Sequence, residues 1–211
     1  VATPAERVED SEDRCLKPRP KEATDRTTRT LGWKPPEPGE CRPDVPAVCA
    51  EQCRNKQGSA CFMLASSYRY GIGVERDVPC GLALAKRSCE LGHGGGCSLL
   101  GAAYQTGNGV EKDLQRAEQL LAPSCDAGVP SACIGLAEVW LERGDRIADA
   151  IDRLTSTCQL PQGYHAACHR LGTLYRDGAD VDADPIRARQ LFKRGCKGFK
   201  PSCRALEALE R

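Results

Sequence analysis

Cysteines recur along this chain in pairs, and their spacing restricts the folds that it can adopt. The segments CRNKQGSAC, CELGHGGGC and CDAGVPSAC begin at Cys53, Cys89 and Cys125, hold two cysteines eight positions apart and follow one another every 36 residues. Two more pairs begin at Cys158 and Cys196, after 33 and 38 further residues. A fixed period of this length is typical of repeat proteins. We therefore expect an array of about four to five repeats.

The chain holds 14 cysteines, and their spacing favours disulfide bonds over metal binding. Metal sites favour close Cys-x-x-Cys pairs, and the sequence contains none. Disulfides form in oxidising compartments, so we expect a periplasmic or secreted protein, with the mitochondrial intermembrane space as the alternative. The predicted repeat disulfides join Cys53 to Cys61, Cys89 to Cys97, Cys125 to Cys133, Cys158 to Cys168 and Cys196 to Cys203.

A helical pattern follows the second cysteine of each of the first four repeat pairs. A leucine stands three positions later, a small residue four later and a tyrosine or tryptophan seven later, and these positions share one helix face. The leucines are Leu64, Leu100, Leu136 and Leu171, and the aromatic residues are Tyr68, Tyr104, Trp140 and Tyr175. A glycine such as Gly71 then ends this first helix, because glycine readily adopts the left-handed conformation.

A second helix is predicted in each repeat. Asp77, Asp113 and Asp184 offer N-cap oxygens for its first backbone N–H groups. Gly81 stands eight residues before Cys89, where a missing side chain permits close packing. Each cysteine pair thus links the second helix of one repeat to the first helix of the next. A loop this short contributes roughly 2–4 kcal/mol in the chain-entropy model.

Residues 1–44 differ from the rest because they are rich in proline and lack apolar periodicity. We interpret them as a charged N-terminal arm, followed by the repeat array at 45–211. One interpretation is a solvated linker. The other is an arm clamped by a disulfide between Cys15 and Cys41, with Trp33 packed on the first helices. No leader sequence stands at Val1, so we expect any signal peptide to have been removed.

Four cysteines lie outside the repeat pairs, and four cysteines allow three connectivities. Cys49 and Cys80 both fall on predicted second helices, where stacked neighbours could be joined. We therefore favour Cys49 with Cys80 and Cys15 with Cys41.

The pattern C-x-x-L-G-x-x-Y-x-x-G-x-G-V-x-x-D resembles the Sel-one-like repeat family, a tetratricopeptide-like family, and its cysteine-rich form is similar to the Helicobacter cysteine-rich proteins. The likeness covers about residues 45–211 and is strongest at 71–74 and 107–110. It implies an all-α fold, a right-handed αα-superhelix of disulfide-stapled helix pairs. The third repeat departs from the family because it runs directly from Gly144 to Asp145 without the Gly-x-Gly-Val turn.

Enzyme signatures are scarce. The sequence has no Ser-x-x-Lys, Lys-Thr-Gly or Gly-x-Ser-x-Gly motif, so serine acyl-enzyme chemistry has no candidate. His165 and His169 are four residues apart, a spacing that can place two metal ligands on one helix face, but we interpret them as loop and surface residues. His93 lies in a glycine-rich loop. We expect no catalytic residues, no metal and no cofactor.

The resemblance implies that the first helices line a concave face that binds a partner protein or peptide. With a formal net charge of +1 and a pI near 7.6, nucleic acid is not an expected partner. No run of apolar residues is long enough to span a membrane, and we expect a monomeric scaffold. The candidate binding residues are Phe62, Ser66, Arg69, Tyr70, Gln105, Thr106, Glu138, Leu141, Glu142, His169, Thr173 and Arg176.

Two alternative functions stay open from the sequence. Some cysteine-rich relatives are described as β-lactamase-like, which implies a hydrolase or a penicillin-binding protein. Another relative with this architecture is a mitochondrial intermembrane-space assembly factor that is linked to haem.

Overall fold

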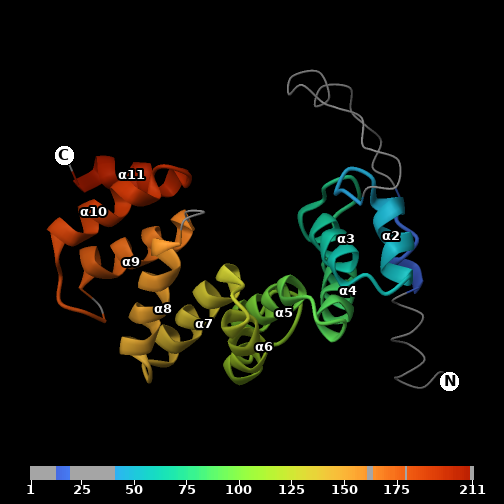
Figure 1. The fold of residues 1–211 in the computed structure, drawn as a ribbon, viewed down its shortest axis with the longest axis horizontal. Coiled ribbons are helices and arrows are strands. Elements are labelled where there is room, and N and C mark those ends of the chain that lie inside the picture. Colours follow the sequence, from blue (N-terminus) through green and yellow to red (C-terminus); the bar gives the residue numbers. More distant parts are fainter. Residues whose placement is uncertain (1–12, 20–40, 161–163, 179, 210–211) are drawn as a thin grey trace. The chain divides into compact units, whose positions relative to one another are not determined.

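The computed structural model describes residues 13–19, 41–160, 164–178 and 180–209, and the elements formed there are helices (Figure 1). They are α2 (Pro46–Arg54), α3 (Gly58–Tyr70), α4 (Val78–Glu90), α5 (Gly94–Thr106), α6 (Leu114–Asp126), α7 (Pro130–Arg143), α8 (Ile147–Gln159), α9 (His165–Asp177), α10 (Pro185–Gly195) and α11 (Lys200–Leu209). The predicted all-α fold of consecutive helix pairs is confirmed.

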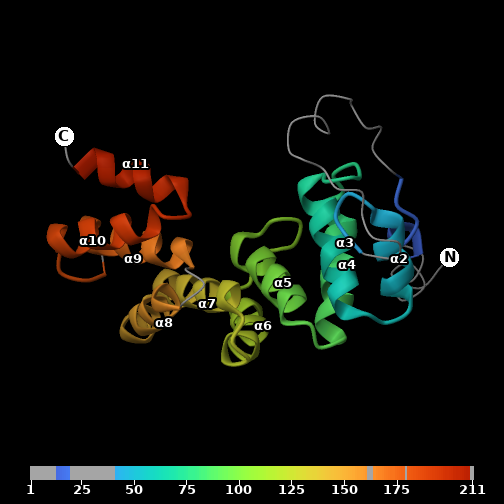
Figure 2. The ribbon, with the colours of Figure 1, turned by 45° about the horizontal axis from the view of Figure 1, so that its top comes forward.

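The chain divides into two compact units, Val1–Asp113 and Leu114–Arg211, a division that the sequence pattern does not predict. In the first unit α2 packs against α3, α3 against α4 and α4 against α5. In the second unit each helix from α6 to α10 packs against the helix that follows it, as both views show (Figure 1, Figure 2). Each helix therefore buries its apolar face mainly against its neighbours in sequence, as expected for repeats.

The five predicted repeat disulfides are all present, with Cα–Cα distances of 4.6 to 4.8 Å. In each of them the second cysteine is the fourth residue of the following helix, as Cys61 is in α3 and Cys133 is in α7. Each bond thus crosses the short loop between two successive repeats, as the spacing indicates.

The favoured pairing of the other four cysteines is wrong. The structure joins Cys15 to Cys80 and Cys41 to Cys49. Cys41 and Cys49 are eight residues apart, and Cys49 is the fourth residue of α2, so this bond has the same geometry as the repeat disulfides. The segment CRPDVPAVC contains this signal, and the sequence interpretation overlooked it.

A short part of the N-terminal arm, residues 13–19, packs against the first unit. Cys15 and Leu16 are buried, with 1% and 5% of their surfaces accessible. Arg14 donates to Asp77 at 3.1 Å, and Asp77 also accepts the backbone N–H of Cys80 as the N-cap of α4. Arg54 donates to the carbonyl oxygen of Leu16. The arm is thus anchored at the start of α4, whereas Trp33 lies outside the described residues.

Small residues set the close approach of helices, as the sequence pattern predicts. A Cβ atom added at Gly81 would lie 3.1 Å from the carbonyl oxygen of Ala65 and 3.3 Å from the backbone nitrogen of Arg69. Contacts this short would push α4 away from α3. The glycine that ends α3, Gly71, adopts φ 69°, which confirms the predicted left-handed termination.

Candidate functional site

Four candidate binding residues lie on α3 in the first unit. Tyr70 is 65% exposed and lies beside Arg69, whose guanidinium carbon is 5.9 Å from the centre of the tyrosine ring. Nη1 of Arg69 is buried and has no hydrogen-bond partner among the described residues. The ring of Phe62 is 5.1 Å from that of His93, and Ser66 is half-buried. The end of α3 therefore presents an exposed aromatic ring beside a half-buried arginine.

Gln105 and Thr106, the two candidates on α5, lie on a helix that contacts α3. Gln105 is half-buried and Thr106 is exposed. The Thr106 hydroxyl donates to the carbonyl oxygen of Ala102 at 2.8 Å. The first unit thus places its six candidate residues on two neighbouring first helices.

In the second unit, Glu138 on α7 accepts a 2.6 Å hydrogen bond from Arg170 on α9. Both side chains are about one third exposed, and sequence reasoning missed Arg170. Glu142 is exposed. Leu141 is buried, with 7% of its surface accessible, so its prediction as a binding residue is wrong. Its position on α7 faces the packed interior.

The candidates on α9 are engaged in local packing. The ring of His169 lies 5.5 Å from Phe192 and 5.2 Å from Phe199. Burial, followed by the charges of Arg176 and Arg170, lowers the pKa of His169. Burial and the two neighbouring cations therefore favour the neutral form of this imidazole.

Two further α9 candidates make contacts within the helix. The Thr173 hydroxyl donates to the carbonyl oxygen of His169 at 3.0 Å. Arg176 forms two hydrogen bonds with Asp177, at 2.6 and 3.0 Å. In the described part of the chain, no group of three His, Cys, Asp or Glu side chains could hold a metal ion. No helix there is long and apolar enough to cross a membrane.

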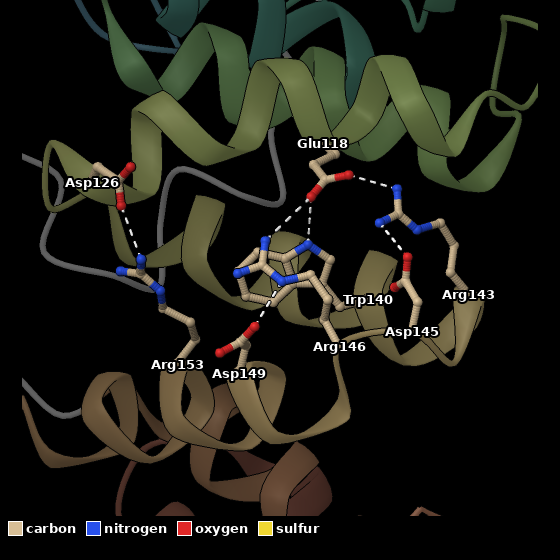
Figure 3. A network of polar contacts seen from close by, with 8 residues as sticks. All are labelled: Glu118, Asp126, Trp140, Arg143, Asp145, Arg146, Asp149 and Arg153. Carbon is tan, nitrogen blue, oxygen red and sulfur yellow. Dashed lines mark hydrogen bonds and ion pairs between the residues drawn. The ribbon is translucent and has the colours of Figure 1, made fainter.

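A polar network that sequence reasoning missed joins α6, α7 and α8 (Figure 3). Glu118 on α6 accepts hydrogen bonds from the indole N–H of Trp140 at 2.6 Å and from Arg143 at 2.5 Å, both on α7. The guanidinium of Arg146, which precedes α8, stacks over the Trp140 ring at 3.9 Å and pairs with Asp149 at 2.7 Å. Trp140 occupies the aromatic position of the repeat that lacks the Gly-x-Gly-Val turn.

The network fixes the ionisation of Glu118. The hydrogen bond from Trp140 is the largest cause that lowers the pKa of Glu118, burial opposes it, and Arg143 and Arg146 lower it further. The carboxylate is thus charged at neutral pH and ties three helices together. Its side chain is 24% exposed, so we interpret it as structural, replacing the missing turn.

The profile of the Sel1 repeat family matches residues 58–93, 96–129 and 165–198. The chain is similar in structure to a Sel1 repeat protein from Oxalobacter formigenes, with 22% identity, a TM-score of 0.64 and coverage of 79% of this chain and 69% of that chain. It is also similar to c5321, a protective antigen of uropathogenic Escherichia coli displaying an SLR fold, with 22% identity and a TM-score of 0.60. This match covers 76% of this chain and 35% of that chain.

Cysteine-rich protein B of Helicobacter pylori matches 77% of this chain and 97% of its own at 20% identity, with a TM-score of 0.32. No curated protein sequence is significantly similar to this chain. The proteins from Oxalobacter formigenes and uropathogenic Escherichia coli thus share the helical repeat fold with this chain.

Proposed function

Because three segments of this chain match the Sel1 repeat and the chain has the fold of Sel1 repeat proteins, we propose that it is a scaffold that binds a partner protein or peptide on its first helices. Sel1 repeats form scaffolds for protein–protein interaction, and the family is generally non-enzymatic. We propose the array at 45–211 as the binding part, with its concave face formed by the first helices.

The observation that carries this proposal is the surface at the end of α3, formed by Arg69, Tyr70 and Ile72. Tyr70 is 65% and Ile72 is 47% exposed, although large apolar side chains gain free energy from burial. Nη1 of Arg69 lacks a hydrogen-bond partner among the described residues. Tyrosine and arginine are enriched among the residues that dominate binding energy at interfaces. A partner that covers this surface would bury the tyrosine ring and the side chain of Ile72.

The disulfides support an oxidising location outside the cytoplasm, because all fourteen cysteines are paired in the structure. We propose a periplasmic or secreted protein that acts as a monomer. No observation in the described residues favours the hydrolase or the haem-linked assembly factor, so we propose only the scaffold.

The proposal is tested by photocrosslinking with a cell-envelope extract. Tyr70 is replaced by p-benzoylphenylalanine in the full chain, and we expect a discrete crosslinked partner because this side chain would lie within the interface. The Arg69→Ala change should reduce the crosslinked yield several-fold. As a control, the same photoreactive residue is placed at Lys86, an exposed position on α4. Equal yields from positions 70 and 86, or no product from position 70, would contradict the proposal.

A further inference from the structure

Positive charge is concentrated on α10 and α11, although the chain as a whole is nearly neutral. Residues 185–209 contain seven arginine and lysine residues and one acidic residue, Glu207, whereas the whole chain has a net charge of +1. Four of the cations lie on α10: Arg187, Arg189, Lys193 and Arg194. The other three are Lys197, Lys200 and Arg204.

These cations are available to an external partner. All seven residues are exposed, and none forms an ion pair with a carboxylate among the residues that the structure describes. Elsewhere in the second unit, Arg143, Arg153 and Arg170 form ion pairs with carboxylates. These arginines therefore have carboxylate partners within the fold, whereas the cations of α10 have none among the described residues.

Two of these guanidinium groups line a groove of about 310 Å³ between α8 and α10. Arg187 and Arg194 stand on its α10 side, two helical turns or roughly 10 Å apart along the axis. Gln190 lies between them, and Thr155 and Gln159 line the α8 side. Leu171 and Leu191 add apolar lining. The groove thus combines two cations with neutral side chains that can donate hydrogen bonds.

Arg187 is held in position by an aromatic ring. Its guanidinium carbon lies 4.2 Å from the centre of the Tyr175 ring. This stacking uses the face of the guanidinium and leaves its in-plane N–H groups available. A planar, oriented guanidinium is suited to bidentate recognition of a carboxylate.

We propose that the groove between α8 and α10 binds an acidic segment of a partner protein, through carboxylates that pair with Arg187 and Arg194. Two carboxylates roughly 10 Å apart on one face are three residues apart in a polyproline II segment or seven apart on a helix. This site lies on second helices, so it is separate from the α3 surface of the proposed function and does not depend on it.

The groove favours a protein segment over an anionic membrane or a nucleic acid. Its hydrogen-bonding side chains lie in a depression, whereas a membrane surface is flat, and only Ile186 on α10 is a strongly exposed apolar residue, at 75%. Stacking of bases on exposed aromatic rings is typical of single-stranded nucleic-acid sites, and this groove has no aromatic lining residue.

The test uses the full chain and a twelve-residue peptide of repeated Glu-Ser-Ser units, labelled with an uncharged fluorophore, in fluorescence anisotropy at physiological salt. A peptide of Gln-Ser-Ser units is the neutral counterpart. We expect the glutamate peptide to bind at least about tenfold more tightly than the glutamine peptide. The affinity of the double variant R187Q/R194Q for the glutamate peptide should be lower by about the same factor, because both cationic partners of the carboxylates are removed.

The matched control is R189Q/K193Q, which removes the same charge from the same helix. Arg189 lines a separate groove with Ile186 and Leu209, and Lys193 lies one turn further on that side. The dissociation constant of this variant for the glutamate peptide should stay within about twofold of that of the unchanged protein, since the variant retains both arginines of the groove. Circular dichroism checks that both variants are folded.

Three results would overturn the proposal. The first is no binding of the glutamate peptide to the unchanged protein. The second is equal weakening by both double variants, which would indicate a diffuse electrostatic attraction. The third is tighter binding to anionic phospholipid vesicles or duplex DNA than to the peptide, which would assign the charge to a membrane or a nucleic acid.

Discussion

A chain that carries Cys15→Ser and Cys80→Ser should lose about 4 kcal/mol of its free energy of unfolding, because this disulfide closes by far the longest loop of the seven. The two cysteines are 65 residues apart, whereas the other pairs are separated by 7 to 10 residues. Loop entropy depends on the logarithm of loop length, so the two shorter disulfides inside this loop reduce the figure only slightly. Guanidinium unfolding under non-reducing conditions, followed by circular dichroism at 222 nm, measures the loss.

The matched control is the variant Cys89→Ser with Cys97→Ser, which opens an eight-residue loop in the same unit. Its expected cost is about 2.5 kcal/mol in the same entropy model. A Cys15 and Cys80 variant that is no less stable than the Cys89 and Cys97 variant would show that residues 13–19 add nothing to the stability of the first unit.

The change Glu118→Gln should lower the free energy of unfolding by about 1–2 kcal/mol at pH 7, because it weakens charge-assisted bonds from Trp140 and Arg143 and keeps the side-chain shape. The folded-state pKa of Glu118 is lowered, so its stabilising contribution is present above the ordinary carboxyl pKa and is lost as the pH falls through the lowered value. The difference between the two proteins should therefore shrink in acid. Denaturant unfolding at pH 7 and at pH values below 4 checks both statements.

Asp126→Asn is the control for Glu118→Gln, because Asp126 forms a single 3.0 Å pair with Arg153 and is 64% exposed. An exposed pair contributes little, so this variant should stay within about 0.5 kcal/mol of the unchanged protein. The account is contradicted if both changes lower the free energy of unfolding equally, or if the loss caused by Glu118→Gln does not vary with pH. In either case the network does not stabilise α6, α7 and α8 as described.

Local rules explain why much of the fold can be predicted from the sequence. The five repeat disulfides depend on spacing within one loop, and the end of α3 depends on the conformational freedom of Gly71. The N-cap of α4 depends on Asp77 and a backbone N–H three residues later. Each of these features involves residues that are close in the sequence, so their pattern is sufficient.

Features formed by residues far apart in sequence could not be predicted in the same way. Cys15 and Cys80 meet only because residues 13–19 fold back on α4, and no periodicity specifies that contact. Glu118 meets Arg143 across 25 residues, where the missing turn of the third repeat gives only an indirect signal. The unpaired cations of α10 become informative only once the packing defines which arginines have partners.

Disulfide mapping after cleavage at glutamate, without reduction, tests most directly whether disulfides hold the repeats and the arm in the arrangement described. We predict that fragment 41–51 is released with an internal disulfide, and that fragment 13–22 is linked to 76–90, which is linked in turn to 91–111. Linkage of fragment 41–51 to 13–22 or to 76–90, or a free thiol at Cys89, would contradict the account.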